Sequence, residues 1–335
     1  MEIQQYRKIF RDIVRGYSEV SVSGYKYYVK HLTSLDQVDI DDVEAYYLKQ
    51  AKDRGLQNQT DILPDLYTDG TWSPKEESQI ERLNNFLEEL SRNKKQLVLK
   101  SAIDKQNKSI DETIAKIKDL NSKRAQAMGA NVEDYASKRS NDHYIIKSFF
   151  KDEDLKNPLF PDESDFDELF LDEVMLFINE YNKAFRSFEE QIIQTMILQD
   201  FYYIYFPFSD DTVGFFGNPV CYLTYNQLKL IVYTKIFKNI FEQNPNIPDS
   251  IKKDPRALLD YGNISDEAKS KMKEQIDKGQ DGSTLFGATA EDYEYAGLDN
   301  PNDKVGMSLQ KAAEKKGGSL NMQDLMELSG HGPKK

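Results

Sequence analysis

The chain has 335 residues, of which 30% are charged, and its 57 acidic and 44 basic side chains give a net charge of −13. A surplus of carboxylates repels phosphate groups, so we expect no binding to nucleic acid and none to membranes. The single cysteine, Cys221, excludes an intramolecular disulfide framework, and its place in an aromatic stretch predicts a buried, inert thiol.

Residues 1–72 are expected to form an N-terminal helical region. Apolar residues at three- and four-residue spacings predict an amphipathic helix over residues 3–14, ended by Gly16. A second helix is expected over residues 35–56, after an apolar patch around His31. Residues 62–70 are rich in turn-forming side chains and predict a connector.

Residues 73–129 predict a long charged helical arm or hairpin. Its start is marked by Ser73 as the N-cap, Pro74 at the first helical position and Glu76 three residues after the cap. Gly129 offers a stop. Either one kinked helix or two helices folded back around residues 93–101 fits the pattern. We favour the hairpin, because an isolated helix would leave its apolar stripe in water.

A seven-residue leucine repeat gives this arm an apolar seam. Leu83 and Leu90 are seven residues apart and Leu87 lies between them, which is the spacing of a coiled coil. We expect these three residues to contact another helix, and they are candidates for protein interaction. We expect self-association through the arm as one form of this interaction.

Residues 130–243 are expected to form an aromatic-rich helical core domain. Asn131 or Asp134 opens its first helix, and residues 151–173 hold ten acids against two lysines, which predicts an extended acidic segment. A long helix is expected over residues 172–205, stopped by Pro207. Thr224 as N-cap, with Gln227 three residues later, opens another helix.

The loop between these two helices carries Phe215 and Phe216, flanked by Gly214 and Gly217. Residues 201–241 contain 13 of the 39 aromatic residues, so the densest core is expected there. We favour packing of both rings into this core. The alternative is an exposed apolar tip that docks into a partner, and both residues are therefore candidates for protein interaction.

Residues 244–335 are expected to form a linker and a loosely structured C-terminal tail, because apolar side chains become sparse after Ser265. The predicted fold is therefore mainly α: a multi-helix protein with a coiled-coil-like arm or hairpin and an aromatic-rich helix–loop–helix core. Its most apolar window, residues 192–208, is shorter than the roughly 20 apolar residues of a membrane span.

The sequence contains no motif for catalysis, cofactor binding or metal binding. His31, His143 and His331 are far apart and fit no metal-ligand spacing. Residues 277–288 resemble a calcium loop only in part, since Ala288 replaces the bidentate glutamate. We therefore expect no enzyme activity, no cofactor and no metal. A regulatory adaptor that binds a host or viral enzyme is an alternative, and a hydrolase using carboxylates such as Asp210 and Asp211 is another.

Several phrases together resemble bacteriophage tail morphogenesis proteins, of the tail-assembly chaperone and baseplate-hub class. They are WSPKEE at residues 72–77, GANVEDYA at 129–136, FFGNP at 215–219 with LTYNQ at 223–227, IPD at 247–249 with DP at 254–255, and FGATAED at 286–292. The resemblance implies a protein made in the cytoplasm of the infected host, whether or not it enters the virion. It also implies partners among viral tail, baseplate or tape-measure proteins, and it supplies no catalytic residues.

Overall fold

The computed structural model describes residues 1–97, 99–245, 247–264 and 292. The fold is mainly helical, as predicted, and it also contains a small sheet of three strands. The expected C-terminal tail and the partial calcium loop lie outside the described residues, apart from residue 292.

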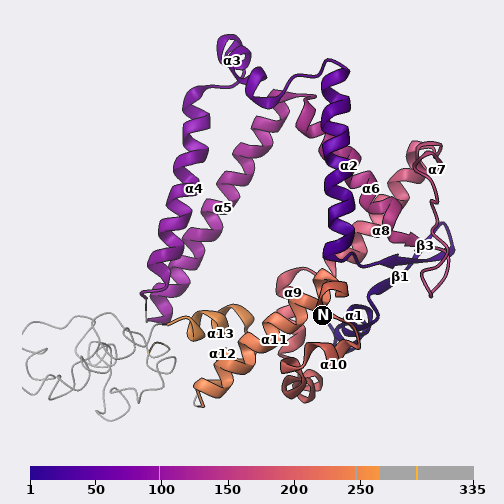
Figure 1. The fold of residues 1–335 in the computed structure, drawn as a ribbon. Helices are drawn as coiled ribbons and strands as arrows, with labels where there is room; N and C mark the ends of the chain where they lie inside the picture. The colour runs from indigo at the N-terminus through magenta and orange to yellow at the C-terminus, as the bar shows by residue number, and fades with distance from the viewer. Residues whose placement is uncertain (98, 246, 265–291, 293–335) are drawn as a thin grey trace, which may run out of the picture.

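Two pairs of helices form two sides of a triangular frame, and they meet near α3 (Figure 1). The bounds of these helices are α2 Ser34–Asp53, α3 Gln59–Asp69, α4 Pro74–Lys94, α5 Lys100–Met128 and α6 Val132–Ser148. α2 packs along α6, and α4 packs along α5. The hairpin expected for the arm is thereby confirmed, with its turn between Lys94 and Lys100.

Local capping signals explain where these helices begin. The Ser73 side chain accepts a hydrogen bond from the Glu76 amide, 3.3 Å, and the Glu76 carboxylate accepts one from the Ser73 amide, 2.9 Å. Asn131 caps α6 in the same position, through the amide of Asp134 at 2.7 Å. Both starts match the sequence prediction, because a cap depends only on residues within one helical turn.

The base of the frame holds the larger core, as predicted for the aromatic stretch. Its buried side chains come mainly from α1 Ile3–Arg15, α9 Glu190–Ile197, η1 Asp200–Asp210, α11 Tyr225–Gln243 and α13 Pro255–Gly262, and α5 and α12 Asp249–Lys252 add Ile103 and Ile251. Tyr202 on η1 is fully buried, and its hydroxyl lies 2.8 Å from the Thr234 hydroxyl on α11. Thr224 caps α11 and Gln227 completes the capping box, as predicted.

The sheet and the smaller core were not predicted. β1 Tyr17–Val22 and β2 Tyr25–Lys30 form an antiparallel hairpin, and β3 Phe149–Phe150 pairs with β2. The sheet thus joins the regions delimited above as residues 1–72 and 130–243. α8 Leu171–Arg186 packs on β1. α7 Glu163–Asp167 is attached to α6 by Arg139, whose Nη1 and Nη2 lie 2.9 and 3.0 Å from the Asp167 carboxylate.

Several predicted features differ in the structure. Residues 62–69 belong to α3 rather than to a connector, and Gly70 ends this helix with a positive φ angle of 72°. Pro64 removes one backbone hydrogen bond inside α3 but does not end it. The helix expected over residues 172–205 is divided into α8, α9 and η1. A tight turn after Arg186 lets Phe188 be buried with its ring 4.5 Å from the His31 ring.

Pro207 lies inside η1 and does not stop the helical run, since the φ angle of proline fits a 3₁₀ turn. The aromatic loop contains the short helices α10 Thr212–Phe216 and η2 Val220–Tyr222. The linker after α11 likewise contains α12 Asp249–Lys252 before α13.

Candidate functional site

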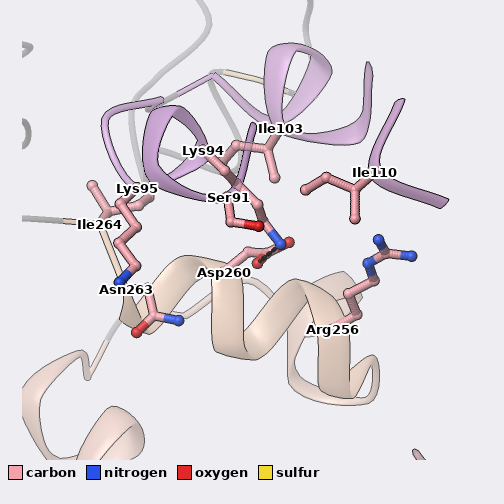
Figure 2. Close-up of a pocket in the computed structure, with 9 residues that line it drawn as sticks. All are labelled: Ser91, Lys94, Lys95, Ile103, Ile110, Arg256, Asp260, Asn263 and Ile264. Atoms are coloured by element: carbon pink, nitrogen blue, oxygen red, sulfur yellow. Dashed lines mark ion pairs between the residues drawn. The ribbon is translucent and has the colours of Figure 1, made fainter. Parts of the chain in front are cut away.

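One candidate site is a cavity of about 260 Å³ where the arm meets α13 (Figure 2). We call it the corner cavity. It is lined by nine residues: Ser91, Lys94, Lys95, Ile103, Ile110, Arg256, Asp260, Asn263 and Ile264. Asp260 projects from α13 toward the arm, where it meets Lys94.

Three charged groups of the corner cavity, those of Lys94, Asp260 and Arg256, already have partners. Asp260 is 8% exposed, and its carboxylate lies 2.5 Å from Lys94 Nζ and accepts a hydrogen bond of 2.9 Å from Asn107 Nδ2. Arg256 donates to the Asp111 carboxylate at 2.8 and 3.0 Å, which lowers the pKa of Asp111 and raises that of Arg256. The cavity is therefore a joint between α13 and the arm, with its central charges already paired.

A residue distant in sequence caps the start of α5 beside this joint. The Asp292 carboxylate accepts hydrogen bonds from the Ser101 amide, 2.8 Å, and from the Ser101 hydroxyl, 2.9 Å. Asp292 is fully buried, whereas the N-cap residue Leu99 has no side chain able to cap. A carboxylate at this position also complements the positive end of the helix dipole.

The second candidate site is a larger pocket at the base of the frame, between α1, η1 and α10. Its volume is about 630 Å³. It is lined by Phe10, Arg11, Val14, Arg15, Tyr205, Phe208, Asp211, Gly214 and Phe215. We call it the basic pocket, because two arginines stand beside its apolar walls.

Aromatic packing and one glycine shape the basic pocket. The Phe10 ring lies 4.8 Å from that of Tyr205, which lies 5.9 Å from that of Phe215. Asp211 caps α10 by accepting a hydrogen bond of 2.9 Å from the Gly214 amide. A Cβ atom at position 214 would lie 2.2 Å from Asp211 Oδ2. Glycine is therefore needed at position 214 for this cap to form.

The arginines of the basic pocket remain accessible. Arg11 pairs with Asp12 at 2.9 Å and Arg15 with Glu153 at 3.4 Å, and the two arginine side chains are 46% and 44% exposed. The Arg15–Glu153 pair is exposed on both sides, so it contributes little and exchanges easily for another carboxylate, whereas the Asp12 side chain of the other pair is 9% exposed. Asp12, the only acid of α1, is buried, and this burial raises its pKa.

Apolar side chains around the basic pocket are exposed to solvent. Phe208 is 60% exposed and Val14 on α1 is 39% exposed, and both line the pocket. Large exposed apolar side chains that adjoin a cavity are typical of a surface that binds a partner. The arrangement suits a partner segment in which acidic residues flank a large apolar side chain.

The structure separates the two groups of predicted interaction residues. Leu83, Leu87 and Leu90 lie on α4, where Leu90 is 8% exposed and the other two are half-buried. Phe215 and Phe216 are half-buried at the edge of the larger core, with rings 4.7 Å apart, and Phe215 also lines the basic pocket. Phe215 and Phe216 thus lie between the two alternatives, packing into the core and an exposed apolar tip, since each ring packs on the core and is only half-buried.

His31, Cys221 and the Asp210–Asp211 pair lie in different surroundings. His31 is 1% exposed, with Nε2 2.9 Å from the Ser18 hydroxyl, and burial lowers the pKa of His31 to about 3. Cys221 is exposed, so the predicted buried thiol is wrong: η2 carries it on the outside of the aromatic loop. Asp210 pairs with Lys238, which lowers the pKa of Asp210, and Asp211 caps α10.

Within the described part of the chain, no group of three or more His, Cys, Asp or Glu residues is arranged to hold a metal ion. In that same part, no helix has the length and apolar character needed to cross a membrane. Comparison with protein-family models, with curated proteins and with solved structures finds no match to this chain.

Proposed function

We propose that this chain is a non-enzymatic bacteriophage morphogenesis protein that binds tail, baseplate or tape-measure components through the basic pocket. The observation that carries this proposal is the pocket itself, a cavity of about 630 Å³ with apolar walls, two accessible arginines and an exposed ring, Phe208, at 60% exposure. The narrower assignment to phage assembly rests on the sequence phrases of residues 72–292 quoted above.

The pocket favours a particular kind of partner segment. Phe10, Tyr205 and Phe215 offer an apolar surface to a large side chain, and burial of such a side chain contributes about 1.5–3 kcal/mol. Arg11 and Arg15 attract carboxylates next to that anchor. The expected partner is therefore an amphipathic protein segment with acidic residues, in the manner of helix-in-groove recognition.

The frame supports this role by holding the pocket on rigid elements. Phe10 belongs to α1, and α1 also contributes Ile9 and Ile13 to the larger core, where they are 6% and 0% exposed. A wall anchored in a core is preorganised, which reduces the entropy lost on binding. In the same frame α4 and α5 lie away from α1 and α10 (Figure 1), so the arm and the basic pocket are separate surfaces of the protein.

The experiment compares two serine variants on η1. Phe208→Ser removes an exposed ring from the basic pocket, whereas Ile204→Ser removes an equally exposed side chain, 66%, that does not line it. Each tagged protein is produced in infected host cells, purified and analysed by mass spectrometry. We expect the wild type and Ile204→Ser to capture tail, baseplate or tape-measure proteins, and Phe208→Ser to lose them.

Two results would overturn the proposal. One is capture of no virion component by the wild type. The other is equal capture by wild type and Phe208→Ser. Capture of a cellular or viral enzyme in place of virion components would assign the protein to the regulatory adaptors instead.

A further inference from the structure

The first two turns of α8 expose apolar side chains to solvent. Phe170 is 76% exposed, Leu171 78%, Met175 47% and Leu176 44%. We call these four residues the α8 patch. Large apolar side chains grouped in this way mark an interaction site on a folded protein.

The opposite face of the same helix is already buried. Phe177 is 9% exposed and belongs to the smaller core, where Val174, Ile178 and Tyr181 also pack. At 100° per residue, Leu171, Met175 and Leu176 fall within an arc of about 140°, and the centre of this arc lies about 140° around the helix from the centre of the core residues. A helix that is apolar on both faces is normally covered on both. The outer face of α8 therefore fits a second protein surface.

The residues around the α8 patch and those of the basic pocket carry opposite charges. Residues 162–173 contain seven acids and no base; two of the acids, Glu163 and Asp167, pair with Arg139, and Asp172 is exposed beside Leu171. α1, which forms one wall of the pocket, contains four bases and one acid. Complementary charges of this kind direct and orient association.

We propose that the α8 patch of one copy docks into the basic pocket of a second copy. The inference rests on the proposed role of that pocket as a docking site, and it names a second copy of this chain as an occupant. The patch supplies the apolar anchor and Asp172 the carboxylate, and the pocket supplies apolar walls with Arg11 and Arg15 at its side.

This contact joins two different surfaces of the molecule. The patch lies on α8, next to α7, whereas α1 and α10 lie at the base of the frame (Figure 1). A pair joined by one such contact has one patch and one pocket unused, and further copies that fill them generate a head-to-tail chain or a closed ring. A twofold dimer requires both patches to reach both pockets at once, and the separation of the two surfaces favours the chain or ring.

The test is sedimentation velocity over a wide range of concentrations. We expect the wild type to form oligomers that grow with concentration and that added salt dissociates. Leu171→Ser in the patch and Phe208→Ser in the pocket should each weaken self-association by about tenfold or more. Val38→Ser, which removes an apolar side chain of 58% exposure on α2, should associate as the wild type does.

The decisive experiment mixes the two weakened variants. Leu171→Ser keeps an intact pocket and Phe208→Ser an intact patch, so the mixture should form a one-to-one dimer that does not grow further. A wild type that stays monomeric at every concentration would overturn the inference, as would a mixture that forms no dimer. Either failure leaves the proposed function standing if Phe208→Ser still loses virion proteins and Leu171→Ser retains them.

Discussion

Lys94 and Asp260 form an ion pair of 2.5 Å that ties the end of α4 to α13 and so closes the frame. The pair is shielded from water, since the lysine side chain is 22% exposed and the aspartate side chain 8%. Asn107 Nδ2 donates a hydrogen bond of 2.9 Å to the same carboxylate from α5. One carboxylate thus connects α13 to both helices of the arm, which lie far from it in the sequence.

We expect Asp260→Ala to lower the free energy of unfolding by about 3 kcal/mol, because it leaves a shielded ammonium group without its counter-charge. Asp111→Ala is the matched control. This variant also removes a carboxylate that forms an ion pair at this corner, with Arg256. Asp111 is 57% exposed, so the pair should contribute about 1 kcal/mol or less to the free energy of unfolding. Urea unfolding measures both, and equal losses would show that burial does not set the strength of the joint.

The seam of the arm gives a second prediction. Leu90→Asp puts a charge at a buried position of α4, 8% exposed, and should lower the free energy of unfolding by several kcal/mol. Phe86→Asp changes an apolar residue of 46% exposure on the same helix and should change stability by about 0.5 kcal/mol or less. Thermal unfolding of both variants checks this. Equal melting temperatures would mean that α4 and α5 do not pack through Leu90.

His31 predicts a loss of stability in acid. In the folded protein burial lowers the pKa of His31 to about 3, so it stays neutral at pH 5, whereas the unfolded chain binds a proton near pH 6.5. Lowering the pH from 7 to 5 therefore stabilises only the unfolded state, by about 2 kcal/mol. His31→Gln should lack this component and give a flatter plot of unfolding free energy against pH. Parallel plots would contradict the prediction.

The cap of α10 gives a fourth prediction, tested by a double-mutant cycle. Asp211→Ala removes the hydrogen bond to the Gly214 amide and should cost about 1 kcal/mol. Gly214→Ala displaces the same carboxylate, because its Cβ would lie 2.2 Å from Asp211 Oδ2. The double variant should then be about as stable as either single one. Additive losses would mean that the glycine and the cap act independently.

Helix starts could be predicted from the sequence because their signals are local. Ser73 and Thr224 each satisfy an amide within one turn, and no distant residue is needed. The β1–β2 hairpin was missed although Ser23 and Gly24 form its turn with positive φ angles of 51° and 84°. The flanking strands lack a clear alternation of apolar and polar residues, and their stability depends on α8 and β3, which come much later in the chain.

The candidate site was predictable only in part. Phe215 stood out because it lies in an aromatic loop with two glycines. Phe208 was counted with the core, since spacing along η1 does not reveal which of its rings face solvent. Arg11 and Arg15 carried no signal, because the pocket forms only when α1 packs against η1, nearly two hundred residues further along.

The central claim, that the basic pocket binds a viral assembly protein, is tested most directly by site-specific photo-crosslinking in infected cells. A photoreactive residue is placed at Val14, which lines the pocket and is 39% exposed, and in a parallel sample at Ile204, which is exposed on η1 but does not line the pocket. We predict cross-links from position 14 to a tail, baseplate or tape-measure protein, and none from position 204. Absence of a virion protein among the cross-links from position 14 would contradict the claim.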